Sequence, residues 1–198
     1  MSEQKANPNA TFILASGSAR RRELLADLLD DYEVIIAEVE EFPSHPDGSL
    51  VLVAANARLK ARAVAEQRPE AWVLGADTIV ALGDEVLGKP ADLGEAKRML
   101  KLLSGKTHEV STGLCLVRVE TGYEETRVET SRVTFRELDD ETITEYFAEV
   151  NPLDKAGGYA IQIRGELIVD RFEGSRSNVI GLPMEMLGDW FRELDAFG

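Results

Sequence analysis

Residues 12–25 of this chain read FILASGSARRRELL and combine three local signals in order. The four apolar residues Phe12–Ala15 are typical of a short buried strand. Ser16-Gly17-Ser18 is a turn of small residues, and leucines recur at helical spacing from Leu24 onward. The segment therefore predicts a strand, a tight turn and a helix.

The remaining chain alternates the same two kinds of element. Further strands are expected at Tyr32–Ile36, Trp72–Ala76, Thr78–Leu82 and Glu166–Phe172, with a long hairpin of Glu109–Val119 and Glu125–Phe135 around Thr121-Gly122. Helices are expected at about residues 50–67, at Leu93–Leu103 behind a capping-box pattern of Asp92 and Glu95, at Asp139–Glu149, and after Pro183. This order predicts an α/β fold with a mixed sheet flanked by helices.

The composition is that of an ordinary globular protein. With 198 residues and 44% apolar content, one domain over residues 11–198 can form its own core, behind a polar tail of residues 1–10. No apolar run approaches the roughly 20 residues that span a bilayer, and the first ten residues lack a signal-peptide core. The one cysteine, Cys115, lies in an apolar run and is interpreted as a core residue. These features together favour the cytoplasm.

The formal net charge of −14 argues against binding to nucleic acid polymers or to anionic membranes. A small anionic ligand is still compatible with this charge, provided that Lys, Arg or a metal ion gather locally around it. Most of the surface carboxylates need no explanation beyond solubility or adaptation to salt.

The turn after the first strand is the first candidate anion site. Ser16 and Ser18 offer hydroxyl donors, and Arg20 and Arg21 offer planar guanidinium groups suited to phosphate. The competing interpretation is structural: Ser18 caps the helix and the arginines are solvated.

Asp77 and two lysines form the next candidates. Asp77 directly follows an apolar strand, where open α/β sheets place ligands, and can bind a metal or take a proton from water; an Asx turn is the alternative. Lys89 lies between Gly88 and Pro90 in a rigid setting for a point charge, and Lys60 lies in an Ala-rich helix. Taken alone, either lysine is more simply a solvent-facing residue.

Two loops complete the set. The carboxylates of Glu38–Glu41 suit either a solvated loop or a Mg²⁺ site that the substrate helps to fill. In Pro152–Gln162, Gly157 and Gly158 permit a close backbone approach, and the Gln162 amide can read a base edge as both donor and acceptor. A flexible entry loop is the alternative there.

The order of these motifs is more specific than any one of them. Leu14–Arg21, Glu41, Lys60-Ala61, Gly75–Thr78, Gly88–Asp92, Leu103–His108, Pro152–Gln162 and Asn178–Pro183 together resemble the Maf family of nucleotide pyrophosphatases over roughly residues 12–187. Ala19 departs from the family's proline, and Glu38 and Glu40 stand where it has aspartates. The second departure leaves open which carboxylate of the loop binds metal.

The resemblance implies an elongated two-lobed α/β structure with a central cleft, similar to the inosine-triphosphate pyrophosphatases, a divalent metal (Mg²⁺ or Mn²⁺), and often a homodimer. It implies a general-base role for Asp77, substrate binding by Ser16, Ser18, Arg21, Lys60 and Lys89, and metal binding by Glu41 and Asp77. Arg20, Thr78 and Gln162 fall where substrate preference is set, and they match the branch acting on dTTP and UTP.

The expected reaction is hydrolysis of a nucleoside triphosphate between its α- and β-phosphates, giving a monophosphate and pyrophosphate. The chain shows no Cys–His constellation for a covalent intermediate, since His45 and His108 are interpreted as a loop and a hairpin residue. Two alternatives stay open: a pyrophosphatase that removes modified nucleotides, and a module linked to septum formation that binds triphosphates without turnover.

Overall fold

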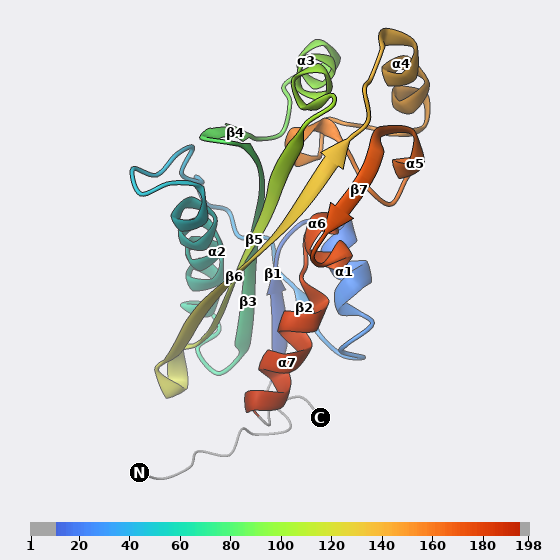
Figure 1. Cartoon of the computed structure of the whole chain (residues 1–198). Helices are drawn as coiled ribbons and strands as arrows, with labels where there is room; N and C mark the ends of the chain where they lie inside the picture. Colours follow the sequence, from blue (N-terminus) through green and yellow to red (C-terminus); the bar gives the residue numbers. More distant parts are fainter. Residues whose placement is uncertain (1–10, 195–198) are drawn as a thin grey trace.

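A computed structural model describes residues 11–194, which form one seven-stranded mixed sheet with helices around it (Figure 1). The strands follow the order β2-β1-β3-β5-β6-β7, with β4 paired to β3 alone. Their bounds are β1 Phe12–Ala15, β2 Glu33–Val34, β3 Trp72–Leu82, β4 Glu85–Leu87, β5 Thr107–Arg118, β6 Tyr123–Phe135 and β7 Val169–Glu173. β1 runs parallel to β2 and β3, and all other pairs are antiparallel, which confirms a mixed sheet.

The helices divide the molecule into two lobes (Figure 1). Their bounds are α1 Ala19–Leu25, α2 Ser49–Ala65, α3 Leu93–Leu103, α4 Asp140–Glu149, α5 Gly165–Ile168, α6 Arg176–Ile180 and α7 Met184–Leu194, with 3₁₀ turns at Val119–Thr121 and Ala156–Gly158. In the lower lobe, α2 covers one face of the sheet while α1 and α7 cover the other. In the upper lobe, α3, α4 and α5 gather around the far ends of the long strands.

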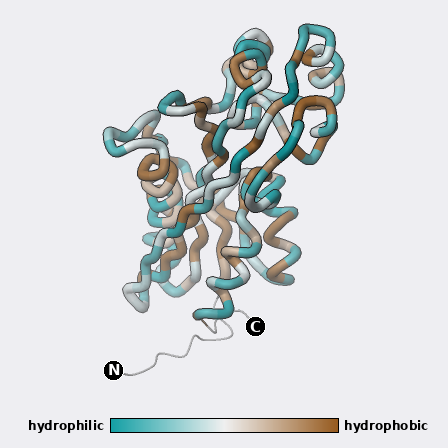
Figure 2. The backbone as a smooth tube through the Cα atoms, in the orientation of Figure 1, coloured by the Kyte–Doolittle hydropathy of each residue, from teal (hydrophilic) through white to brown (hydrophobic). Residues whose placement is uncertain are grey.

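Strand periodicity builds the core of the lower lobe. In β1, Phe12 and Leu14 pack in one cluster with α7, and Ile13 and Ala15 pack in another cluster with α2. Successive side chains of a strand point to opposite faces, so one apolar run serves both layers. Figure 2 accordingly shows hydrophobic residues along the central strands and polar ones around the outside. A third cluster, around Leu100, Phe135 and Tyr146, forms the core of the upper lobe.

Two glycines let α2 lie directly on the sheet. A Cβ atom at Gly75 of β3 would come within 2.2 Å of the Ala57 carbonyl oxygen, and one at Gly113 of β5 within 2.6 Å of the Val53 carbonyl oxygen. Both obstacles are helix backbone, which cannot move aside as a side chain can. The bare backbone at Gly75 and Gly113 therefore sets the distance between α2 and the strand that carries Asp77.

The first expected result concerns this contact. Gly75→Ala should lower the free energy of unfolding by about 3 kcal/mol, the upper part of the range for overpacked cores. Urea denaturation is the measurement. Gly188→Ala in α7 is the matched control, since its nearest contact would be a flexible Arg192 atom at 3.6 Å and a helical Gly→Ala change is neutral or stabilising. Equal stability of the two variants would contradict a close contact at Gly75.

Several predicted elements are confirmed. Asp92 caps α3 by accepting a hydrogen bond from the Glu95 amide at 2.8 Å, as the capping-box pattern indicates. β5 and β6 form the long hairpin, paired from Thr107 to Arg118. Cys115 is fully buried, and burial raises the pKa of its thiol to about 11, as suits a core residue. Within residues 11–194, no helix is long and apolar enough to cross a membrane. The predicted tail, residues 1–10, lies outside the described residues.

Other boundaries are wrong. The strand expected at Tyr32–Ile36 pairs only at Glu33–Val34, and Ile36 is 65% exposed, because the chain leaves the sheet edge there. The strand expected at Glu166–Phe172 begins as helix α5 and pairs only from Val169. Arg164 explains the difference: its left-handed backbone (φ 49°) turns the chain, and its carbonyl accepts the Leu167 amide. The short elements β4 and α6 were not predicted.

Candidate functional site

A cleft of about 780 Å³ is lined by residues of both lobes, and it collects all the predicted site residues. Its lining includes Ser16, Ser18, Arg20, Arg21, Glu41, Lys60, Asp77, Thr78, Lys89 and Gln162. Residues that are up to 146 positions apart, from Ser16 to Gln162, therefore share one cavity. Of the acidic loop, Glu41 lines the cleft, whereas Glu38 and Glu40 are exposed and do not.

The cleft is locally cationic although the protein is acidic. Five basic side chains and three carboxylates line it, in a chain with a formal net charge of −14. Two of these eight, Asp154 and Lys155, were not among the predicted site residues. Such an excess of positive charge inside a concave site is the arrangement that concentrates a polyanion.

Asp77 lies inside a strand and not at its end, which corrects the expectation. β3 continues unbroken from Trp72 to Leu82, and Asp77 pairs with Gly113 of β5. The parallel pairing with β1 nevertheless stops at Ala15–Gly75, two residues earlier. β1 ends there and the chain turns away through Ser16. At the level of Asp77, β3 therefore has no neighbouring strand from residues 11–194 on the edge that β1 occupies further back.

Lys60 joins the two predicted metal-binding carboxylates. Its ammonium lies 2.7 Å from Asp77 Oδ1 and 2.8 Å from Glu41 Oε2. Asp77 is only 6% exposed, and a buried carboxylate needs an opposite charge beside it, which Lys60 supplies. Among the described residues, no hydrogen bond reaches the second Asp77 oxygen, Oδ2. We call Glu41, Lys60 and Asp77 the charged triplet.

Arg21 binds the protein with most of its hydrogen-bond donors. Its Nε donates to the Gly181 carbonyl at 2.8 Å, and Nη1 to the Ala76 carbonyl at 3.0 Å and to Ser16 Oγ at 3.2 Å. Its Nη2 donates to Thr78 Oγ1 at 2.9 Å. A guanidinium group has five N–H donors, so one is left for a ligand. Burial lowers the pKa of Arg21, while the Asp77 carboxylate opposes that shift.

Ser16 and Ser18 organise the turn after β1. The Ser16 hydroxyl oxygen accepts the Ser18 amide at 3.3 Å, and the Ser18 hydroxyl oxygen accepts the Arg21 amide at 3.4 Å as the N-cap of α1. The capping interpretation is therefore confirmed, and Ser18 also lines the cleft. The other half of that interpretation, solvated arginines, is wrong: Arg21 makes four hydrogen bonds to the protein and Arg20 pairs with Asp154.

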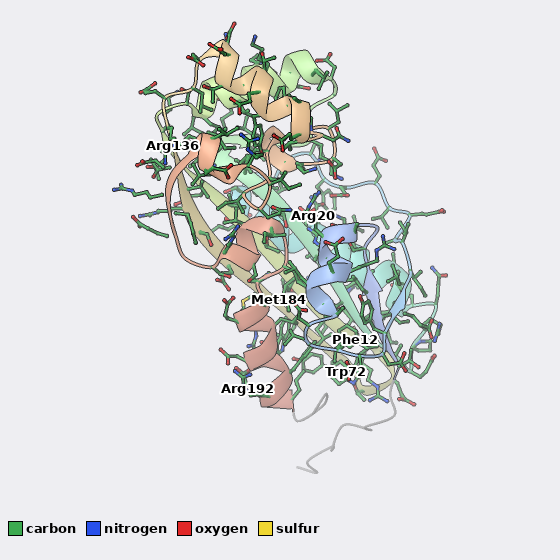
Figure 3. All side chains as sticks on the ribbon, turned by 90° about the vertical axis from the view of Figure 1, so that its right-hand side faces the viewer. Phe12, Arg20, Trp72, Arg136, Met184 and Arg192 are labelled. Atoms are coloured by element: carbon green, nitrogen blue, oxygen red, sulfur yellow. The ribbon has the colours of Figure 1, made fainter. Side chains whose placement is uncertain are left out.

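Arg20 connects the two sides of the cleft. Its guanidinium donates to Asp154 Oδ2 at 2.8 Å and to the Asp154 carbonyl at 3.1 Å. Figure 3 shows Arg20 at the end of α1 nearest the upper lobe. Lys155 holds the other Asp154 oxygen at 2.6 Å. Burial raises the pKa of Asp154, but the hydrogen bonds from Lys155 and Arg20 outweigh it, so the net shift is downward.

The Lys89 ammonium and the Gln162 side-chain amide line the cleft without a hydrogen-bond or ion-pair partner among residues 11–194. Lys89 is exposed. The backbone that carries Gln162 is held firmly: the Tyr146 hydroxyl bonds both the N–H and the carbonyl of Ala160, at 2.8 and 2.9 Å. Arg164, just beyond, is anchored to Glu145 and Glu149 of α4.

The predictions did not include a buried polar network behind the site. Thr78 bonds Thr112 at 2.9 Å, Thr112 donates to the Asn178 carbonyl at 3.2 Å, and Asn178 donates to the Val110 carbonyl and to Ser131. Thr78, Thr112, Ser131 and Asn178 belong to four separate elements, so no local sequence pattern signals the network. Asn56 of α2 was also missed, because one Asn in an Ala-rich helix carries no distinctive pattern.

Comparisons with known proteins show which proteins this chain is similar to. A dTTP/UTP pyrophosphatase of Bacillus cytotoxicus is 49% identical over 189 residues, covering 94% of this chain and 95% of that protein. One of Myxococcus xanthus is 50% identical over 172 residues, covering 87% and 86%. The Ham1 protein of Staphylococcus aureus superposes with a TM-score of 0.54 at 14% identity, over 92% and 98% of the two chains, which shows a shared fold. The family model described as Maf-like protein matches residues 11–194, and the chain belongs to that family.

Proposed function

We propose that this protein is a nucleoside-triphosphate pyrophosphatase that cuts dTTP and UTP between the α- and β-phosphates. The observation that carries the proposal is the meeting of the charged triplet with the cationic lining of one cleft. A triphosphate needs several cations at once, and a hydrolase needs a base beside them. The relatives named dTTP/UTP pyrophosphatase support the same substrates. A cytoplasmic location also belongs to the proposal.

A divalent cation fits the residues present. Glu41 and Asp77 bring two carboxylates within reach of one ammonium group, and Mg²⁺ typically uses one or two carboxylates plus substrate phosphates. The described residues contain no cluster of three or more His, Cys, Asp or Glu side chains, so the substrate would supply further ligands. When bound, such a cation supplies charge neutralisation on the phosphate oxygens.

In this proposal, separate residues of the chain bind the phosphates, orient the base and accept the proton. Lys89, Ser16, Ser18 and the remaining N–H of Arg21 bind the phosphate oxygens, and Lys60 fixes the orientation of the Asp77 carboxylate. Asp77 accepts a proton from a water molecule as the water oxygen bonds the α-phosphorus. The bond from that phosphorus to the bridging oxygen breaks, and pyrophosphate leaves with its negative charge balanced by Lys89 and Arg21. No covalent enzyme intermediate is required.

A panel of triphosphates with Mg²⁺ or Mn²⁺, read by pyrophosphate release, tests the proposal. Turnover is expected with dTTP and UTP. Thermal stabilisation by triphosphates without pyrophosphate would instead identify a nucleotide-binding module. Faster turnover of modified nucleotides than of dTTP would identify an enzyme that removes damaged nucleotides. A homodimer is also part of the proposal, and sedimentation of the full chain tests it.

The second expected result is a preference for dTTP and UTP over GTP, ATP and CTP that depends on Gln162. Uracil and thymine present O4 as an acceptor beside the N3–H donor, and one amide satisfies both. In cytosine the donor and the acceptor are exchanged. If Gln162 is held in one orientation, CTP therefore loses about 1–3 kcal/mol of transition-state stabilisation relative to UTP, or roughly 5- to 150-fold in kcat/KM. The measurement is kcat/KM for each nucleotide at equal metal concentration.

Gln162→Ala should reduce this discrimination. If purine triphosphates lead in the parent protein, the proposed substrate class is wrong. If the parent prefers uracil and thymine nucleotides and Gln162→Ala keeps the same ranking, the substrate class stands and the role of Gln162 does not.

A further inference from the structure

Asn56 of α2 makes an unusual contact with the acidic loop. Its side-chain Oδ1 accepts the Phe42 amide at 2.8 Å, and its Nδ2 donates to the Phe42 carbonyl at 3.1 Å. The side chain therefore bonds both polar groups of one residue, as a neighbouring strand does in an antiparallel pair. Asn56 is only 3% exposed, so these two bonds are what satisfies its amide.

Phe42 directly follows Glu41, and its bonded N–H belongs to the peptide group that links the two residues. Holding that peptide limits where the Glu41 side chain can reach. Glu41 itself is about half exposed, with 47% of its side chain accessible, and it forms an ion pair with Lys60 at 2.8 Å. A half-exposed carboxylate on a loop loses conformational freedom when it binds an ion, and a fixed backbone reduces that loss.

Asn56 and Lys60 are one helical turn apart, so they project from the same face of α2. Lys60 reaches both carboxylates of the charged triplet, and Asn56 reaches the loop that carries one of them. α2 is in turn seated on the sheet by the close contact at Gly75. One rigid helix face therefore sets the distance between Glu41 and Asp77.

We propose that Asn56 is a positioning residue that raises the affinity of the site for a divalent cation by holding Glu41 toward Asp77. This inference rests on the metal role of Glu41 in the proposed function. Residues that orient the ligands of a metal, without touching it, typically change affinity or activity by 10- to 100-fold when replaced.

The test is Mn²⁺ binding to the full chain with α,β-methylene-dUTP, followed by electron paramagnetic resonance. Asn56→Leu, which keeps a similar volume, should weaken Mn²⁺ binding on the order of 10- to 100-fold. Glu41→Gln should weaken it at least as much. The double variant should bind within about twofold of Glu41→Gln alone, because Asn56 acts through Glu41. Asn56→Ala removes the same bonds without apolar bulk and replaces the Leu variant if that variant does not fold.

Amide hydrogen exchange gives a second readout without metal or turnover. The Phe42 amide should exchange about tenfold faster or more in Asn56→Leu, because both bonds to that residue are lost. Tyr146→Phe is the matched control, since the Tyr146 hydroxyl makes a similar pair of hydrogen bonds to the N–H and the carbonyl of Ala160 in the other lobe. It should leave the exchange rate of the Phe42 amide within about twofold of the parent value.

The possible results distinguish the positioning role of Asn56 from the metal role of Glu41. Parent-like Mn²⁺ affinity in Asn56→Leu with weak binding in Glu41→Gln would overturn this inference alone. Losses that multiply in the double variant would show that Asn56 acts independently of Glu41, which also overturns it. Parent-like affinity in Glu41→Gln would overturn both the metal role of Glu41 and the inference that rests on it.

Discussion

Asp77→Asn is expected to lower kcat for pyrophosphate release by about 1,000-fold or more while the protein stays folded. General-base catalysis alone contributes roughly 100- to 10,000-fold, and the amide also removes one negative charge from the proposed metal site. Asn has almost the same size as Asp and can still accept the bond from Lys60, which keeps Glu41 as its ionic partner. The melting temperature should therefore change little.

The measurements are kcat with dTTP at saturating Mg²⁺ and thermal denaturation of the same preparation. Asp154→Asn is the matched control, because it also removes a carboxylate of the cleft but one that contacts Arg20 and Lys155. Its kcat should stay within about tenfold of the parent value. An Asp77→Asn enzyme that is equally active would remove Asp77 from the role of base.

Lys89→Ala is expected to cost roughly 2–4 kcal/mol of transition-state stabilisation, or about 30- to 1,000-fold in kcat/KM. Lys89 lines the cleft with no partner among residues 11–194, so its charge is available to the phosphates. For the same reason the substitution should not change stability. Arg21 is a less direct probe, because Arg21→Ala would also remove its hydrogen bonds to the Gly181 and Ala76 carbonyls.

The measurement is kcat/KM for dTTP beside a urea unfolding curve. Lys97→Ala is the control: Lys97 belongs to the same lobe and pairs with Asp140 at 3.1 Å, outside the cleft lining. Lys97→Ala removes the same charge outside the cleft. It should alter kcat/KM by less than threefold, because salt screens the effect of a distant surface charge. Parent-like kcat/KM in Lys89→Ala would return Lys89 to its simpler interpretation as a solvated base.

Local patterns were sufficient for much of the fold. The apolar run of β1, the capping pair of α3 and the β5–β6 hairpin are each encoded within a few residues, because strand and helix periodicities and N-caps depend on near neighbours. The candidate residues differ in this respect: each motif is weak by itself, and it is their order along the chain that resembles the Maf family and points to phosphate chemistry. All ten of them line one cleft.

Long-range contacts account for what the local patterns did not show. Asp77 reads as the end of a strand, since nothing near it reveals that β5 continues the pairing through Gly113. Arg21 reads as a free phosphate ligand, yet four of its donors go to Ser16 and to groups 55, 57 and 160 positions away. Asn56 carries no signal until the acidic loop folds against it.

The residue order was enough to predict the secondary structure of the longer elements and the mixed sheet, because periodicity is a property of the chain itself. The expected chemistry came from the order of the motifs, through their resemblance to the Maf family. The partner of each polar group depended on packing. Gly75 and Gly113 bring α2 into backbone contact with the sheet, and that approach brings Lys60 to Asp77 and Asn56 to the acidic loop. A hydrogen bond forms only within about 3 Å, and distances that short between separate elements exist only once the core has packed.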